Sequence, residues 1–433
     1  MKQISDKLFY ILVLVTTACH GSNSFGPVSN DTSKVINLTP PKPDVNLTLP
    51  QGFSATVFAD GLGKARHISV TPSGYVYVKL DSYKKGKTIV RLKDSNGDGI
   101  ADQEVDFGSF KGTGIVAKNG YLYASSDVEV FRFKLNDDGT VANAAQPEKI
   151  ITGLISRGEH EAKAFTLDNE GNIYVNIGAF SNSCQVADRQ TGSLGMKPCP
   201  VLDSAAGIWQ FRADKLNQTY ADGTRYATGL RNVVGIDWNL ATNSLFVMQH
   251  GRDQLHSIFP SIFTDQQNAE LPAECMFELH KGSNAGWPYI YYDAAQGKKM
   301  LAPEYGGDGK KTAGEDAIDP VVAFPAHLAP NGLLFYTGNQ FPEKYKNGAF
   351  VAFHGSWNRA PEPQEGFYVA FVPFSNGKPS GKWEIFANGF SGGADKTASG
   401  RAIHRPCGLA QGPDGSLYVT DDSKGTIWRI TYK

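Results

Sequence analysis

Six short runs along the chain share one pattern, a turn residue or small residue followed by β-branched, aliphatic and aromatic positions. This composition is typical of half-buried strands. Most of the runs are soon followed by a second strand-like run, so each unit predicts a β-hairpin. The six runs are 74–78, 120–124, 172–176, 244–248, 348–352 and 415–419.

A hairpin unit that recurs at this scale indicates a radial repeat, and we predict an all-β fold, a six-bladed β-propeller spanning residues 49–433. A β-sandwich with coincidentally similar hairpins is the alternative. Six similar units make this alternative weaker than the propeller. Strand-like residues 53–58 and 427–432 stand at the two ends, so we expect the N- and C-terminal strands to pair and close the ring. The repeat breaks over 253–347, with a partly helical segment at 264–280, and long excursions are usually functional loops.

The N-terminus predicts export. Residues 1–18 have the basic start, short apolar run and small residues of a lipoprotein-type signal peptide, and Cys19 is the expected lipidation site. Thr16 departs from the aliphatic residue usual there, and an ordinary signal peptide with an incidental cysteine is the alternative. Residues 19–48, rich in Ser, Asn, Thr and Pro, predict a flexible tether. We therefore expect an exported bacterial lipoprotein facing the periplasm or cell exterior, with membrane contact only through the lipid anchor.

The charge balance argues against one class of partner, and the cysteines indicate where a disulfide could form. The chain has 42 basic and 43 acidic residues and no basic run, so nucleic acid has no electrostatic support as a partner. Export permits disulfides, and Cys184 and Cys199 bracket a polar loop after the third repeated run, which predicts a bond between them. Cys275 and Cys407 lie far apart in sequence and are interpreted as buried thiols.

A calcium-loop pattern occupies residues 94–102, with oxygen-bearing side chains at alternate positions and glycine where the backbone must turn. Val105 stands where an EF-hand has its bidentate Glu. A structural Ca²⁺ site and a plain polar hairpin turn both remain open, because Asn-Gly and Asp-Gly also form turns. The candidate ligands are Asp94, Asn96, Asp98 and Asp102.

Polar residues cluster at the ends of the repeated strands. Ligands of propellers bind over the central channel on loops from several blades, so such residues can converge on one axis. A lone His is more often structural, but equivalent placements on four blades favour a site. These residues are His160, Arg231, Asn232, Gln249, His354, Arg405 and Asp422.

Several of these segments, in order, resemble a known family. Gly158-Glu159-His160 and residues 171–178, 229–232, 284–288, 329–342, 354–359 and 405–422 carry the resemblance. The chain is similar to the glucose/sorbosone dehydrogenases, six-bladed propellers that use pyrroloquinoline quinone (PQQ), and is nearest to the sorbosone-dehydrogenase-like branch. The resemblance covers about Leu49 to the C-terminus.

The resemblance implies PQQ and Ca²⁺ as cofactors and oxidation of an aldose or related sugar aldehyde at the anomeric or aldehyde carbon, with an unidentified electron acceptor. It implies His160 as the general base. PQQ is a tricarboxylate, which needs cationic partners. The implied cofactor contacts are Arg231, Asn232, Gln249, Arg359, Arg405 and Asp422, and backbone oxygens of Gly251 and Arg252 are the implied Ca²⁺ ligands.

Two departures leave the substrate class open. Residues 161–164 replace small residues and an arginine usual in the family, which could mean altered or lost cofactor binding, and Cys407 replaces an aliphatic residue. A metal-dependent propeller lactonase is one alternative, but it would need several Asp, Glu or Asn ligands, whereas these positions are rich in Arg and His. A non-catalytic exported propeller that binds a partner is the other.

Overall fold

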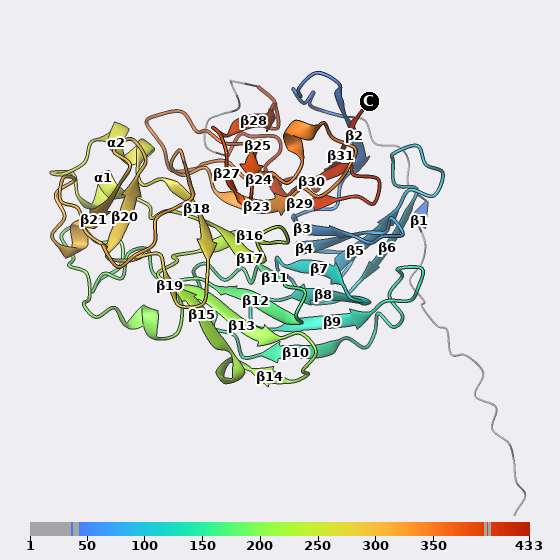
Figure 1. The fold of residues 1–433 in the computed structure, drawn as a ribbon, viewed down its shortest axis with the longest axis horizontal. Coiled ribbons are helices and arrows are strands. Elements are labelled where there is room, and N and C mark those ends of the chain that lie inside the picture. Colours follow the sequence, from blue (N-terminus) through green and yellow to red (C-terminus); the bar gives the residue numbers. More distant parts are fainter. Residues whose placement is uncertain (1–35, 38–42, 394–395, 397–399) are drawn as a thin grey trace, which may run out of the picture. The chain divides into compact units, whose positions relative to one another are not determined.

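The structure is a computed structural model that describes residues 36–37, 43–393, 396 and 400–433. In this part of the chain, six mainly antiparallel sheets follow one another in sequence order around a central channel, as the colour gradient of Figure 1 shows. The six-bladed β-propeller predicted from the repeats is confirmed. Along the axis lies a cavity of about 250 Å³, lined by the innermost strands of all six blades.

Each blade contains four strands, which are given below in order from the channel to the outside of the ring. Blades one to three carry one additional short strand each, β1, β14 and β19. Blade one contains β3 (Ala65–Val70), β4 (Val76–Lys84), β5 (Lys87–Lys93), β6 (Gln103–Phe107) and β1 (Ile36–Asn37). Blade two contains β7 (Ile115–Lys118), β8 (Tyr121–Ser125), β9 (Val130–Lys134), β10 (Glu148–Thr152) and β14 (Gln218–Thr219). Blade three contains β11 (Phe165–Leu167), β12 (Asn172–Ile177), β13 (Gly207–Arg212), β15 (Thr224–Thr228) and β19 (Ser283–Asn284).

The second half of the chain builds the other three blades. Blade four contains β16 (Val233–Asn239), β17 (Ser244–Gln249), β18 (Glu274–Leu279) and β22 (Val322–Phe324). Blade five contains β23 (Pro330–Phe335), β24 (Ala349–Phe353), β25 (Tyr368–Val372) and β28 (Glu384–Ala387). Blade six contains β29 (Pro406–Gln411), β30 (Leu417–Asp421), β31 (Ile427–Tyr432) and β2 (Phe53–Ala59).

Helices and small ribbons decorate the loops. The ribbons are β20 (Ile290–Asp293) with β21 (Lys298–Leu301), and β26 (Phe374–Ser375) with β27 (Lys378–Pro379). The α-helices are α1 (Leu255–Ile258) and α2 (Asp265–Glu270), and the 3₁₀ turns are Pro200–Asp203, Tyr220–Asp222, Pro303–Tyr305 and Glu343–Tyr345. Among the described residues, no helix is long and apolar enough to cross a membrane.

Blade six is closed by both ends of the chain, as the terminal strands predicted. β2 pairs antiparallel with β31, with Phe53 opposite Tyr432. The Phe53 ring packs edge-on against Phe341, with ring centroids 4.8 Å apart, and against Phe386 at 5.0 Å. Such pairs contribute about 0.5–1.5 kcal/mol each beyond their buried area, so the closing strand is also held by aromatic packing.

The six repeated runs are the second strands of the blades, not the innermost ones. A second strand lies between two strands of its own sheet and between two neighbouring blades, so β24 and β30 are buried along their whole length. In blades one and two the innermost strands are only partly buried, as in β7 with one buried residue in four, so their hydrophobic pattern is weaker.

The break predicted over 253–347 is shorter than expected. This stretch supplies β18 and β22 of blade four and starts blade five with β23. The segment predicted as partly helical, 264–280, contains α2 and then continues into β18. Glu274 to Leu279 is nearly all buried, and Cys275, Phe277 and Leu279 form an apolar set at every second position, as in a strand.

Residues 1–35 and 38–42 lie outside the described residues, as do the predicted signal peptide and Cys19. The described end of the predicted tether is not free: Asp44 pairs with His404 at 2.6 Å, and Thr48 bridges to Asn388. Val45 is buried against the aromatic cluster beside blade six. The boundary at Leu49 was therefore placed too late.

Candidate functional site

One end of the propeller carries the candidate site, where the innermost strands begin and the second strands end. In blades one, four, five and six, the innermost strand shifts register near its start, as β16 does between Val233 and Ile236. Such bulges bend a strand and redirect its side chains. Arg66, Arg231 and Arg405 stand at or just before these irregular starts, so three blades bring a guanidinium group to the same end.

His160 has a fixed orientation and tautomer in the loop before β11. Its backbone is left-handed, with φ of 50°, a conformation unusual for a residue with a side chain. A Cβ on Gly178 would lie 2.6 Å from the Cβ of His160, so glycine is required there. Nδ1 bonds the Ala179 carbonyl, which places the proton on Nδ1 and leaves the lone pair on Nε2. Burial and the Arg231 charge lower the pKa of His160 to about 3.

Arg231 is buried, with 3% of its surface exposed, and its guanidinium binds the protein itself. Nη1 donates to the Gly251 carbonyl at 2.7 Å, and Nη2 donates to Asp253 at 2.7 Å. Nε and Nη2 also donate to Asn182, at 3.2 and 3.0 Å. This arginine is therefore a rigid positive charge beside His160, with its donors directed at protein oxygens.

Asp253 joins groups from several loops. Besides Arg231, it accepts a hydrogen bond from Asn358 Nδ2 at 2.7 Å and lies 3.6 Å from Arg189 Nη1 and 3.8 Å from His327 Nδ1. Burial alone would raise the pKa of Asp253, but the neighbouring positive groups outweigh it and lower the pKa to about 2. The carboxylate stays ionised at neutral pH, and the neighbouring positive side chains balance its negative charge.

A second charged group lies between blades five, six and one. Asp422 accepts hydrogen bonds from Arg66 Nη1 at 2.6 Å and from His354 Nε2. Burial opposes ionisation, yet His354 and Arg66 hold the pKa of Asp422 far below its usual range. Arg405 donates to the His354 carbonyl at 3.0 Å and to the carbonyls of the next two residues, and it remains half-buried.

Two more histidines reach across to blade five. His67 Nε2 lies 2.9 Å from the Asn331 carbonyl, and His250 Nε2 lies 3.3 Å from the Pro330 carbonyl. Burial lowers the pKa of His67 to about 4 and that of His250 to about 3. Both rings are neutral at physiological pH, and His67 also lines the channel cavity.

The remaining predicted contacts on blade four lie around Arg231. The Asn232 side-chain carbonyl accepts a hydrogen bond from Asn176 at 3.3 Å, and the Gln249 side-chain carbonyl accepts the Arg231 backbone N–H at 3.2 Å. The Gly251 carbonyl faces Arg231, while the Arg252 side chain points elsewhere, into a buried ion pair with Glu304. The structure thus brings these blade-four residues together.

Arg359 does not join this cluster through its guanidinium. Its Nε donates to the Pro363 carbonyl at 3.0 Å, and Nη1 donates to the carbonyls of Ala269 and Ala326. The side chain is 7% exposed and ties its own loop to the end of α2. The structure therefore places Arg359 in a loop-bracing role, and the cofactor contact implied by the family motif is not visible in its geometry.

The Asp-rich turn between β5 and β6 binds its own backbone. Asp94 accepts the N–H groups of Gly97 and Gly99 at 2.7 and 2.8 Å, and Asp102 accepts that of Ser95 at 3.2 Å. Asn96 and Asp98 bond each other at 3.0 Å. Within the described part of the chain, no group of three His, Cys, Asp or Glu is arranged to hold a metal. The Ca²⁺ loop stays a prediction.

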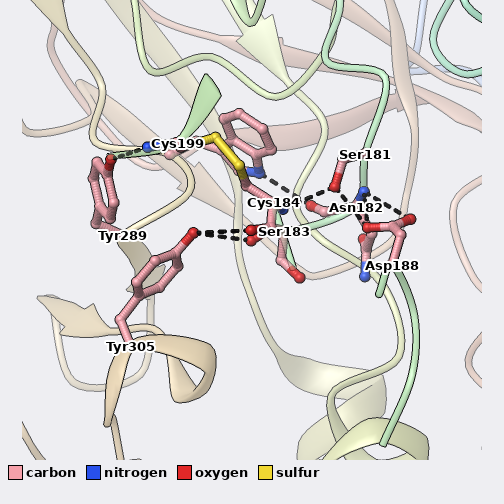
Figure 2. Close-up of a disulfide and its surroundings, with 9 residues drawn as sticks. Ser181, Asn182, Ser183, Cys184, Asp188, Cys199, Tyr289 and Tyr305 are labelled. Carbon is pink, nitrogen blue, oxygen red and sulfur yellow. Dashed lines mark hydrogen bonds between the residues drawn. A yellow bond between two sulfur atoms is a disulfide. The ribbon is translucent and has the colours of Figure 1, made fainter. Parts of the chain in front are cut away.

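Cys184 and Cys199 form a disulfide, the pairing that their loop suggested, with Cα atoms 6.1 Å apart (Figure 2). Cys275 and Cys407 are buried free cysteines. Burial raises the pKa of the Cys407 thiol to about 12. Cys407 is thus an inert packing residue beside the site.

Sequence reasoning missed Arg66, His67, Asp253 and His327. A signal for Arg66 was present: like Arg231 and Arg405, it opens a short apolar run before a repeated strand. Asp253 follows the second strand of blade four as Asp422 follows that of blade six. His327 lies in the short connection 325–329 between β22 and β23 and has no such positional equivalent.

Fold and site together define a class, a six-bladed propeller whose strand starts carry arginines and neutral histidines at one end of the channel. More particularly, the chain belongs to the TrAA12-like family, whose model matches residues 47–433. A PQQ-dependent sugar dehydrogenase of Hypocrea jecorina is 23% identical over 427 residues, covering 92% of this chain and 91% of that protein. The chain spans about half the length of the first curated relatives it matches.

Solved structures share the fold. The holo form of the pyranose dehydrogenase PQQ domain from Coprinopsis cinerea superposes with a TM-score of 0.72 at 20% identity, covering 90% of this chain and 98% of that one. A calcium structure of the Trichoderma reesei carbohydrate-active enzyme of family AA12 gives 0.72 at 18% identity, covering 92% and 99%. The sorbosone-dehydrogenase-like branch stays a prediction.

Proposed function

We propose that this protein is a PQQ-dependent dehydrogenase that oxidises an aldose or related sugar aldehyde at the anomeric or aldehyde carbon. The observation that carries the proposal is His160, a buried imidazole whose tautomer leaves a lone pair on Nε2 beside the fixed charge of Arg231. Family membership and the names of its relatives support the same activity.

The donor set suits an anionic cofactor. Asp253 and Asp422 are each paired with arginine, so neither presents an uncompensated negative charge. Arg405 is half-buried and makes its hydrogen bonds to backbone carbonyls rather than to a carboxylate, so it keeps its positive charge for a ligand carboxylate. We assign Arg405 as the principal carboxylate contact, whereas Arg231 acts mainly as a buried charge.

Ca²⁺ would be held by backbone oxygens of Gly251 and Arg252. The Gly251 carbonyl uses one lone pair for Arg231 and keeps a second. Glu274 holds the Gly251 N–H at 2.8 Å, which fixes this segment of backbone. The calcium structure of the T. reesei relative supports this part of the proposal.

The bound quinone would supply the two-electron acceptor that the side chains lack. His160 would take the substrate hydroxyl proton on Nε2 while the adjoining carbon loses hydride. The Arg231 charge favours the neutral form of His160, so the base is ready at neutral pH. The Ala179 carbonyl holds the ring and accepts the Nδ1–H, which prevents the ring from turning.

Substrate, acceptor and location belong to the same proposal. The sugar would be a small molecule, the electron acceptor is unidentified, and the export signals of the N-terminal sequence support a location outside the cytoplasm as a lipid-anchored protein. A lactonase would need carboxylates open to a metal, whereas Asp253 and Asp422 are engaged by arginine and by an asparagine or histidine.

The test is a titration of the purified apo protein with PQQ and Ca²⁺, followed by absorbance, and then a panel of aldoses with an artificial electron acceptor. The proposal expects a bound quinone chromophore and sugar-dependent reduction of the acceptor only when PQQ is present. Absence of PQQ binding would overturn it and favour the exported binding propeller.

A further inference from the structure

Asn182 is completely buried between blades three and four, two residues before the disulfide. Its side-chain carbonyl accepts hydrogen bonds from Arg231 Nη2 at 3.0 Å and from the Asp253 backbone N–H at 2.9 Å. Its Nδ2 donates to the Asp253 carbonyl at 3.0 Å. The Asn182 backbone carbonyl accepts Arg231 Nε at 3.2 Å and Trp287 Nε1 at 3.0 Å. One residue therefore fixes both members of the Arg231–Asp253 pair.

The loop that carries Asn182 is closed by local bonds. Asp188 accepts hydrogen bonds from Ser181 Oγ at 2.6 Å and from the Asn182 N–H at 3.2 Å (Figure 2). Ser181 Oγ in turn accepts the Cys184 N–H at 2.8 Å. The disulfide to Cys199 then fixes the far end of this turn covalently. Asn182 is thereby held between a folded turn and a covalent link.

The residue after Asn182 makes a parallel contact. Ser183 Oγ donates to Glu304 Oε1 at 2.8 Å, and the same oxygen pairs with Arg252. Glu304 is fully buried, so its charge needs this partner. The disulfide loop thus contacts the side chain of Arg231 and the backbone of Asp253 directly, and it reaches the side chain of Arg252 through Glu304.

We propose that Asn182 is a positioning residue of the reaction site and that the Cys184–Cys199 disulfide maintains its position, which makes site geometry dependent on the redox state of this bond. The proposal rests on the proposed function for its link to catalysis. Without the disulfide, the loop has more conformations available, and Asn182 is held only by hydrogen bonds. Arg231 then loses oxygen partners and its distance from His160 is no longer fixed.

The redox step is a reduction of one sulfur–sulfur bond. A dithiol reductant such as dithiothreitol gives two electrons and two protons, the bond breaks, and two cysteine thiols form while the reductant becomes a cyclic disulfide. The other described cysteines, Cys275 and Cys407, are already thiols and would not change.

Hydrogen–deuterium exchange of the apo protein tests the positioning role without any cofactor. Asn182→Ala and the double variant Cys184→Ser/Cys199→Ser should each make amides in 249–254 exchange about 10- to 100-fold faster, because the Asp253 N–H loses its partner or its rigidity. Asn239→Ala is the matched control. Asn239 is 3% exposed, and its side chain caps a turn at the opposite end of β16. This variant should leave 249–254 unchanged.

Should either variant fail to fold, brief reduction of the folded wild-type protein with dithiothreitol gives the same comparison. Unchanged exchange at 249–254 after reduction or in Asn182→Ala would overturn the proposal. Equal acceleration in Asn239→Ala would overturn it too, since it would show general loosening.

PQQ affinity and turnover then test the link to catalysis. Asn182→Ala should weaken PQQ binding or lower kcat by about 10- to 100-fold, while Asn239→Ala with a similar melting temperature should keep both. Normal PQQ binding and turnover in Asn182→Ala would overturn the catalytic part. If wild-type protein binds no PQQ, the proposed function fails, whereas the exchange result still decides whether Asn182 holds the Arg231–Asp253 pair.

Discussion

The site edges of blades four and six have similar sequences but different chemistry. Each begins its innermost strand with an arginine near a bulge and places an aspartate after its second strand. In blade four the arginine and aspartate bind each other, at 2.7 Å. In blade six Asp422 pairs instead with Arg66 of blade one, and the Arg405 guanidinium donates its hydrogen bonds to backbone carbonyls. The same repeat therefore gives an arginine paired with a carboxylate in blade four, and in blade six an arginine whose positive charge is not paired within its own blade.

The largest effect is expected at His160, next to the blade-four edge. His160→Asn, whose side chain tolerates the left-handed backbone, should lower kcat about 10²- to 10⁴-fold with little change in PQQ affinity, because the base is lost. His354→Asn is the comparison at the blade-six edge, where Asp422 already occupies the ring nitrogen, and it should lower kcat far less. Steady-state kinetics and PQQ titration measure both, and equal losses would show that the base is misassigned.

Substitutions of Arg231 and Arg405 should have different effects, the first mainly on the stability of the protein and the second mainly on PQQ affinity. Arg231→Met leaves buried Asp253 without its main partner, so the free energy of unfolding of the apo protein should fall by about 3–5 kcal/mol. Arg405→Met should cost much less stability but weaken PQQ binding by about 1.5–3 kcal/mol, the value of a hydrogen bond to a charged group. Urea unfolding and PQQ titration give the two numbers. The reverse pattern would contradict the contrast between the blades.

The histidines of the two regions should respond to pH with opposite sign. The pKa of His250 in blade four is lowered from 6.5 to about 3, so between these values the unfolded state binds one more proton than the folded state. Stability should therefore fall as pH drops from 6.5, and His250→Asn should reduce that slope by about 1.4 kcal/mol per pH unit. His280→Asn, at an exposed ring, is the control.

His404 beside blade six should behave in the opposite way. Burial opposes its charge, but Asp421 and Asp44 at 2.9 and 2.6 Å outweigh burial and raise its pKa. This stabilisation is complete below the unfolded pKa and is lost as pH rises through the folded one. His404→Asn should therefore remove a loss of stability above pH 6.5, measured by urea unfolding at several pH values. An unchanged profile would refute the charged pair.

The smallest effect is expected outside both edges, in the turn of blade one. Asp98 accepts the Ile100 N–H at 2.9 Å, so Asp98→Asn should lower stability by about 1 kcal/mol or less and leave PQQ affinity unchanged. Melting temperatures with Ca²⁺ and with a chelator measure whether the turn binds the ion. A fall in PQQ affinity would show that this turn is coupled to the site.

The sequence predicted the ring of blades because the second strands carry a strong apolar signal, and it predicted closure because both ends read as strands. It could not reveal the innermost strands, four of which are bulged and two of which are only partly buried. It brought Arg231, Gln249 and Gly251 together because they border one hairpin. It missed Asp253 as a meeting point because that contact joins loops from separate blades, and such distances depend on how the ring closes.

Closure through β2 and β31 also sets an order of events. Ser54 and Thr431 bond each other at 3.2 Å across 377 positions of sequence, so β2 is synthesised early but can pair only after β31 has been made. Contacts this remote carry a high entropy of loop closure and form late. The ring therefore cannot close before β31 has been synthesised, and a chain truncated before β31 would leave blade six open.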